Sequence, residues 1–326
     1  MRAIVITKPG GPEVLQIQEV PDPVPGDGEV LIRVKAFGVN HAETHMRKGE
    51  WPEATPISGI EAVGTVMTDP SGALAEGTRV LTIMGGLGRT RNGSYAEYTV
   101  APAANVAPIE TSLDWADLAA IPESYATAWL ALHGNLELEA GQSLLVRGAT
   151  SALGQAAVNV ASGLGARVIA TTRRVDRAGL LRSLGADGVV IETGAIAGEV
   201  RGLVPGGADR VLDLVGNSVL RDSLHAAAAG GRVCQAGFLG GLGPVADFLP
   251  AFDMPSGVQF SFFGSFEVGT GPYPISAIPF QEIVAKAEAG VHQAKPARVF
   301  AFEEIADAHQ LMEAGQAGGK LVVTGA

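Results

Sequence analysis

The chain has 326 residues, of which 47% are hydrophobic and 17% charged, and its formal net charge is −11. This length suits two domains better than one core. The acidic balance argues against a nucleic-acid partner, because phosphates would be repelled. No run approaches the ~18 apolar residues that a membrane span needs. The only cysteine, Cys234, can form neither an internal disulfide nor a multi-cysteine zinc site, which fits a cytoplasmic protein.

Strand-like runs separated by Pro and Gly fill the first third of the chain, as at 30–34 and 62–66. From about residue 120 the pattern changes, and short apolar runs alternate with helical stretches. Strands are predicted at 143–146, 167–170, 189–191, 210–214, 232–236 and 260–263, with helices at 155–164 and 178–184. Buried strands separated by helices predict an α/β fold with a doubly wound parallel sheet. A helical stretch after 271, a strand at 299–300, a helix at 305–314 and a strand at 320–324 close the chain.

The first predicted strand of this sheet runs into a loop of small residues and then a helix. This is the setting of a dinucleotide loop, in which the backbone approaches a pyrophosphate at a helix N-terminus. The loop departs from the G-x-G-x-x-G pattern, and an ordinary strand-to-helix turn is the alternative. The residues expected to contact a cofactor here are Ala149, Thr150, Ser151, Ala152, Leu153 and Gly154.

The next predicted strand ends in basic residues. NAD-binding folds place an acid here to bind the ribose 2′-hydroxyl. This chain instead has Thr172 followed by Arg173 and Arg174, with Arg177 one turn later. Guanidinium groups match phosphate oxygens, so we expect NADPH. The alternative is a solvated basic helix start balanced by Asp176.

Two later strand ends carry glycines that would let the backbone contact ribose and nicotinamide. Plain strand-to-helix turns are the alternative reading. The residues expected at the cofactor from these strand ends are Val215, Gly237, Phe238 and Leu239.

Several segments together resemble the zinc-independent, NADPH:quinone oxidoreductase branch of the medium-chain dehydrogenases/reductases. They are 8–15, 38–40, 93–98, 121–129, 148–154 and 319–322, and they span nearly the whole chain in order. The resemblance implies a GroES-like β-rich domain at 1–120, completed by 271–326, and a Rossmann domain at 121–270. It also implies a homodimer formed through the Rossmann domains and an active-site cleft between the two domains.

The resemblance assigns further positions. Thr127 matches a position near the nicotinamide, although a helix-interior threonine is the alternative. Phe263 and Lys320 are also expected at the cofactor, with a core position as the alternative for the phenylalanine.

Zinc-dependent relatives place a Cys where Asn40 lies and a Gly-His-Glu where residues 59–61 lie. Both ligands are missing here, and Glu61 alone cannot hold zinc. We therefore expect no metal. Without a Lewis acid, alcohol oxidation is improbable, whereas reduction of an activated acceptor remains feasible.

Three residues are candidates for the chemistry. Asn40 is expected to donate a hydrogen bond to the acceptor oxygen, with a turn-stabilising role as the alternative. His45 is a candidate proton relay, although a lone histidine is more often structural. Trp51 stands where many relatives have a Tyr; its indole can stack on a quinone ring but cannot act as a phenolic acid.

The sequence therefore predicts an enzyme that transfers hydride from NADPH to a quinone or an α,β-unsaturated carbonyl compound. Two alternatives stay open at this point. One is an enoyl-thioester reductase. The other is a non-catalytic NADPH-binding protein.

Overall fold

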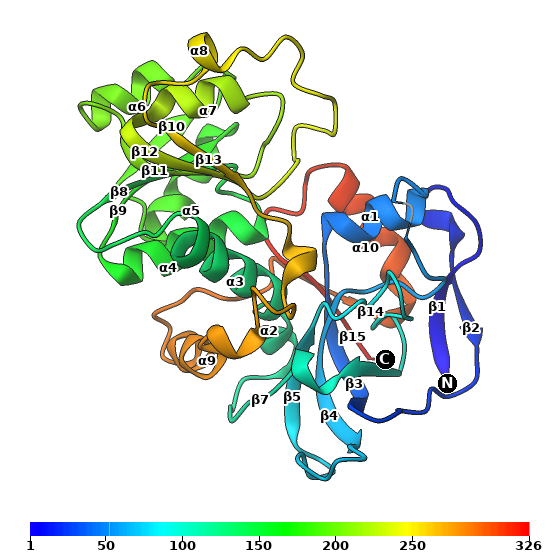
Figure 1. Ribbon diagram of the computed structural model, residues 1–326. Coiled ribbons are helices and arrows are strands. Elements are labelled where there is room, and N and C mark those ends of the chain that lie inside the picture. The colour runs from blue at the N-terminus through cyan, green and yellow to red at the C-terminus, as the bar shows by residue number, and fades with distance from the viewer. Residues whose placement is uncertain (52, 326) are drawn as a thin grey trace. The chain divides into compact units, whose positions relative to one another are not determined.

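The computed structural model describes residues 1–51 and 53–325. The chain divides into two units, which are coloured along the sequence in Figure 1. The β-rich unit comprises residues 1–126, 266–290 and 294–326, and the parallel-sheet unit comprises 127–265 and 291–293. The division at 126/127 falls within the helix α3 (Pro122–Trp129), a few residues after the expected boundary at 120, and the division at 265/266 lies a few residues before the expected 270.

The parallel-sheet unit contains one doubly wound sheet with the strand order β10-β9-β8-β11-β12-β13. All its neighbouring strands are parallel, which confirms the predicted fold class for this half. Its strands are β8 (Ser143–Arg147), β9 (Arg167–Thr172), β10 (Gly188–Ile191), β11 (Ala208–Asp213), β12 (Ala227–Gln235) and β13 (Gln259–Phe262).

Helices cover both faces of this sheet, with α4 and α5 on one face and α6 and α7 on the other (Figure 1). The side chains of Leu145, Ile169 and Val211 pack with Val200 and Leu224 in one core cluster. Burying such aliphatic side chains stabilises the fold by about 1.5–3 kcal/mol each. The helices are α4 (Ala152–Leu164), α5 (Ala178–Ser183), α6 (Ala197–Leu203), α7 (Leu220–Ala226) and α8 (Pro250–Asp253).

The β-rich unit is built on a sheet with the strand order β14-β15-β3-β4-β5-β7, and β6 also pairs with β3. A separate antiparallel pair joins β1 to β2. The strands are β1 (Arg2–Ile6), β2 (Leu15–Glu19), β3 (Glu29–Val39), β4 (Glu61–Thr68), β5 (Arg79–Ile83), β6 (Tyr98–Pro102), β7 (Val106–Pro108), β14 (Arg298–Ala301) and β15 (Leu321–Thr324). Its helices are α1 (His41–Lys48), α2 (Trp115–Ala119), α9 (Phe280–Glu288) and α10 (Ile305–Glu313).

The last strand of the chain completes this unit by pairing with β3. The pairing is antiparallel, with Leu321 opposite Val39 and Val322 opposite Gly38. The residues that continue each strand, Lys320 and Asn40, therefore lie at the same end of the sheet. The C-terminal segment thus supplies a side chain to the polar cluster described below.

Within the described residues, no helix combines the length and apolar character needed to cross a membrane.

Candidate functional site

The loop between β8 and α4 has the form of an anion-binding turn. The Ser151 hydroxyl accepts the Gly154 N–H (3.1 Å) and donates to the Gly148 carbonyl (2.9 Å), which closes the turn and caps the helix. A Cβ at Gly154 would lie 2.6 Å from the Cα of Ala149, so only glycine fits. Along the part of the chain described, the structure gives no partner to the N–H groups of residues 152 and 153. Unpaired N–H groups at the start of a 13-residue helix suit a phosphate.

The end of β9 presents three arginines. Arg174 forms a two-point ion pair with Asp176 (3.0 and 2.6 Å), and Arg177 also lowers the pKa of that carboxyl after the larger effect of Arg174. Arg173 is exposed and has no side-chain partner among residues 1–51 and 53–325. Thr172 exchanges hydrogen bonds with the backbone of Arg174 (3.1 and 3.2 Å), which shapes this turn. Arg173 is thus the guanidinium most available to a 2′-phosphate.

A buried arginine, which the sequence interpretation did not identify, lies directly before the loop. Arg147 ends β8 and is fully buried. Its Nε and Nη2 donate to Glu192 (2.8 and 2.7 Å), and its Nη1 lies 2.9 Å from Asp222 and 3.0 Å from the Ser223 hydroxyl. Glu192 follows β10, the strand that pairs with β9. Because it is bound to Arg147, it does not compete for a ribose hydroxyl.

The turns after β11 and β12 are packed against each other. The Asp213 carboxylate accepts the N–H groups of Val215 (2.9 Å) and Gly216 (2.8 Å), and it also accepts the Ser223 hydroxyl (2.7 Å). A Cβ at Gly237 would lie 2.7 Å from the Leu214 carbonyl oxygen, so the two turns approach through backbone.

The other predicted residues of these turns lie at the same carboxyl edge of the sheet. The Leu239 N–H donates to the Leu214 carbonyl (3.0 Å), and the ring of Phe238 lies 5.6 Å from that of Phe262. Phe263 is buried and Thr127 is buried in α3. A role for these residues at the cofactor stays a prediction.

A polar cluster in the β-rich unit surrounds Asn40, the residue that precedes α1. We call Asn40, Glu43, Glu61, Glu123 and Lys320 the carboxylate–lysine cluster. Glu43 lies one turn into α1, and its Oε2 accepts the Asn40 N–H (2.8 Å), as in a capping box. Glu61 begins β4, and its Oε2 accepts the backbone N–H of Glu123 (2.7 Å). Asn40 is half-buried, whereas the other members are buried.

Lys320 joins this cluster from the C-terminal end of the chain. Its Nζ donates to the Asn40 Oδ1 (2.6 Å) and to the Glu61 Oε1, and it lies 4.0 Å from the Glu123 Oε2. A Cβ at Gly38 would overlap the Glu61 carboxylate and the Lys320 side chain, so glycine is required in the adjacent strand. The structure therefore places the ammonium of Lys320 at Asn40 and Glu61, and its expected role at the cofactor stays a prediction.

Burial and the charged groups of the cluster shift the pKa values of two of its members, Lys320 and Glu43. Burial opposes the Lys320 charge, but the Glu61 and Glu123 carboxylates outweigh burial and raise its pKa. Burial, reinforced by Glu61, raises the pKa of Glu43 to about 7. The cluster therefore contains a lysine that stays charged and a glutamic acid that titrates near neutral pH.

All hydrogen-bonding groups of the Asn40 side chain are engaged inside the cluster. Its Oδ1 accepts from Lys320, which fixes the orientation of the amide. Its Nδ2 donates to the Glu61 Oε1 (2.9 Å) and to the Glu43 Oε1 (3.3 Å). Both amide hydrogens thus have carboxylate acceptors in this conformation, and the predicted contact with an acceptor oxygen stays a prediction.

The other two catalytic candidates lie together at the end of α1. The Nδ1 of His45 pairs with Glu50, and its ring is stacked nearly parallel to the Trp51 indole with 6.1 Å between the centroids. The Arg89 guanidinium lies 5.9 Å from the Trp51 ring and 5.1 Å from the Phe266 ring. His45 therefore has a charged partner, and Trp51 contributes a flat aromatic surface.

A buried network anchors α1 to α10. The Arg47 Nη1 donates to the His309 Nδ1 (3.1 Å), and the His309 Nε2 lies 3.1 Å from the Tyr95 hydroxyl. Arg47 also pairs with Glu313. Burial, with Arg47 adding to it, lowers the pKa of His309 to about 3, so this histidine is neutral. The network holds the helix that carries Glu43 and His45.

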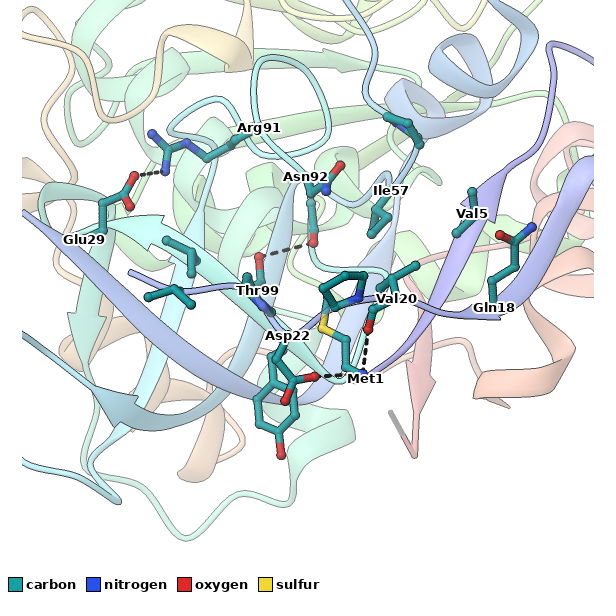
Figure 2. A pocket seen from close by; sticks show the side chains of 17 residues that line it. Met1, Val5, Gln18, Val20, Asp22, Glu29, Ile57, Arg91, Asn92 and Thr99 are labelled. Carbon is teal, nitrogen blue, oxygen red and sulfur yellow. Dashed lines mark hydrogen bonds and ion pairs between the residues drawn. The ribbon is translucent and has the colours of Figure 1, made fainter. Parts of the chain in front are cut away.

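A cavity of about 590 Å³ opens elsewhere on the β-rich unit, beside β1 and β2 (Figure 2). The Met1 ammonium binds Asp22 at its edge (2.7 Å), and Arg91 pairs with Glu29 (2.6 Å). Its described lining residues include none of the predicted site residues. The cavity is therefore separate from the clusters described above.

A β-rich unit joined to a doubly wound unit with a nucleotide loop is the architecture of two-domain dehydrogenases and reductases. Residues 26–111 match the alcohol dehydrogenase GroES-like domain, and residues 184–323 match the zinc-binding dehydrogenase family. The GroES-like fold expected for the first domain is thereby confirmed.

The chain is also similar to whole proteins. It is 30% identical to a quinone oxidoreductase from Sus scrofa, over 99% of this chain and 97% of that protein. A mycobacterial protein solved with NADPH superposes with a TM-score of 0.87 at 29% identity, covering 100% of both chains. An NAD-dependent alcohol dehydrogenase superposes with a TM-score of 0.85 at 31% identity, also over 100% of both. The chain belongs to the quinone oxidoreductase family of medium-chain dehydrogenases/reductases.

The residues at the zinc-ligand positions of metal-dependent relatives do not fit zinc. Asn40 and Glu61 are both bound to the Lys320 ammonium, which would repel a divalent cation. Over residues 1–51 and 53–325, no group of three or more His, Cys, Asp or Glu side chains is arranged to hold a metal.

Proposed function

We propose that this chain is a zinc-independent reductase that uses NADPH to reduce a quinone or an α,β-unsaturated carbonyl compound. The cofactor, when bound, supplies the hydride. The observation that carries the proposal is the combination of a turn that suits a phosphate with a strand end that has no acid and whose Arg173 has no side-chain partner among the described residues. The names of the quinone oxidoreductase and the NADPH-bound relative support it.

The chain's own residues suit this reaction in two ways. The carboxylate–lysine cluster provides a fixed ammonium beside Asn40, and we propose that Asn40 contacts the acceptor oxygen as negative charge develops there. Quinones and enones delocalise that charge themselves, so positioning accounts for much of the catalysis. Trp51 offers a stacking surface for a flat acceptor beside His45.

A binding titration and an activity assay test the proposal. Fluorescence titration should show tighter binding of NADPH than of NADH, and equal affinities would contradict the role of the arginines. NADPH oxidation should then be followed with quinones, enones and enoyl thioesters. Turnover of quinones or enones supports the proposal, and turnover of enoyl thioesters alone would replace it with a thioester reductase. Binding without any turnover would favour a non-catalytic NADPH-binding protein.

We also propose a homodimer formed through the parallel-sheet unit. β13 is an edge strand of the sheet, and Phe260 and Phe262 on it are 40% and 50% exposed. An unpaired strand edge with exposed aromatic side chains is a surface that a second copy can cover. Light scattering should give twice the chain mass, and Phe262→Lys should lower it to one chain. A monomeric wild type would contradict the proposal. A cytoplasmic location stays a prediction from cysteine usage.

A further inference from the structure

The carboxylate–lysine cluster contains more acid than its lysine can balance. Glu43 and Glu61 are fully buried and Glu123 is 9% exposed, while Lys320 supplies the cluster's ammonium. Full ionisation would leave an excess of buried negative charge, which is costly in a low-dielectric interior. A buried carboxyl relieves that cost by holding a proton.

The contacts indicate which carboxyl holds it. Glu61 accepts hydrogen bonds from the Lys320 ammonium and from the Glu123 N–H. Among residues 1–51 and 53–325, no cation contacts Glu43 directly, and its carboxyl oxygens accept from the Asn40 N–H, the Asn40 Nδ2 and the Ile60 N–H. Glu43 is therefore the member that retains a proton most readily.

The groups that face Glu43 come from several elements. Glu61 on β4 raises its pKa, while Lys320 and the Asn40 side chain lower it. Tyr95 is also close enough to feel the Glu43 charge and is held neutral, because burial raises its pKa well above the usual value. On α1 itself, Arg47 is bound by His309 and Glu313.

The two oxygens of Glu43 are bonded unequally. Its Oε2 accepts a short bond from the Asn40 N–H (2.8 Å), whereas its Oε1 accepts long bonds from the Asn40 Nδ2 (3.3 Å) and the Ile60 N–H (3.2 Å). A proton on Oε1 would displace the weakest of these, the bond from Nδ2. One amide hydrogen of Asn40 would then be free, and Asn40 is the member of the cluster that solvent reaches.

We propose that Glu43 is a positioning residue whose protonation releases an amide hydrogen of Asn40 to bind the acceptor oxygen. This inference rests on the proposed function. Lys320 holds the Asn40 Oδ1 throughout, so the freed N–H stays on the same side of the amide. Protonation also removes a negative charge from beside the oxygen on which charge develops, so both effects favour hydride transfer in the acid form.

The pH dependence of kcat/KM with a reducible acceptor tests this directly. In the wild type, kcat/KM should fall about tenfold for each pH unit above about 7, as for a single essential acid. Glu43→Gln cannot ionise and should give a flat profile over this range. Glu76→Gln, which changes an exposed carboxylate between β4 and β5, should keep the wild-type break. A flat wild-type profile, or a break that survives in Glu43→Gln, would overturn the proposal.

Infrared titration provides a measurement that does not need turnover. The carbonyl band of a buried protonated carboxyl should disappear near pH 7 in the wild type and be missing in Glu43→Gln. If no acceptor is reduced, the proposed function fails, and this band alone decides whether Glu43 holds the proton. Should Glu43→Gln not fold by circular dichroism, Glu61→Gln replaces it, because it removes the carboxylate charge that raises the pKa of Glu43. The band's midpoint should then move to lower pH, and an unmoved midpoint or a missing band would overturn the proposal.

Discussion

The Nζ of Lys320 lies 2.6 Å from the Oδ1 of Asn40, although the two residues are 280 positions apart in the sequence. The pairing of β15 with β3 brings them together. This contact links the residue that precedes α1 to the residue that precedes β15. Both belong to the cluster that we propose contacts the acceptor.

Lys320→Met should strongly destabilise the protein. The substitution leaves Glu61 buried without its counter-ion, and losing one partner of a buried pair costs about 3–5 kcal/mol. Urea unfolding measures the change. Lys295→Met is the matched control, because Lys295 is 81% exposed and its partner Asp117 lies 3.6 Å away; it should cost no more than about 1 kcal/mol. Equal costs for the two variants would contradict the buried pairing.

Arg173→Ser should weaken NADPH binding selectively. A charged hydrogen bond to a phosphate contributes about 1.5–3 kcal/mol, so the dissociation constant for NADPH should rise by about 10- to 100-fold. NADH lacks the 2′-phosphate and should bind the variant as it binds the wild type. Arg174→Ser should have a smaller effect because Asp176 already offsets that charge. Arg182→Ser, on the exposed surface of α5, is the control. An equal loss for NADH would point to a general defect.

Gly154→Ala and Gly163→Ala should have opposite effects although both lie in α4. The new Cβ at 154 would lie 2.6 Å from the Cα of Ala149, so the loop must shift. We expect a loss of about 1–3 kcal/mol and weaker binding of both nicotinamide cofactors. The nearest heavy atom to a Cβ at 163 is 4.0 Å away, and this change should stabilise the helix by about 0.5–1 kcal/mol. Thermal unfolding measures the stability of both variants, and fluorescence titration measures their cofactor binding. Similar results for the two variants would contradict the close packing of the turn around Gly154.

His309 should make the protein sensitive to mild acid. Its folded pKa of about 3 lies below the usual value of 6.5, so its contribution to the free energy of unfolding is complete above about pH 6.5 and is lost as the pH falls toward 3. The slope is about 1.4 kcal/mol per pH unit. The stability difference between the wild type and His309→Gln should therefore shrink by about 2 kcal/mol from pH 6.5 to 5. His225→Gln is an exposed control. A difference that does not change with pH would show that His309 is not held neutral.

The parallel-sheet unit was predictable because each strand is a short apolar run followed by a turn. The residues at 143–146 and 210–214 lie at or within two residues of the observed strands. Buried parallel strands have no polar face, so hydrophobicity alone locates them. The loop at Gly154 was also predictable from its small residues between a strand and a helix.

The carboxylate–lysine cluster was only partly predictable. The spacing of Asn40 and Glu43 is a capping-box pattern, which was available in the sequence but was not used. The contact of Lys320 with Asn40 depends on the register of β15 against β3, which no local pattern specifies. Similarly, a charged residue such as Arg147 at the end of an apolar strand indicates that an acid pairs with it in the interior. Which acid this is, Glu192, depends on the order of the strands in the sheet.

Transfer of deuterium to an enone from NADPH that carries deuterium at both C4 positions tests most directly whether the chain is the proposed reductase. If the chain is an NADPH-dependent reductase of conjugated carbonyl compounds, mass spectrometry should find one deuterium on the β-carbon of the saturated product. One mole of cofactor should be oxidised for each mole of product. An unlabelled product, or no oxidation of NADPH although it binds, would contradict the account.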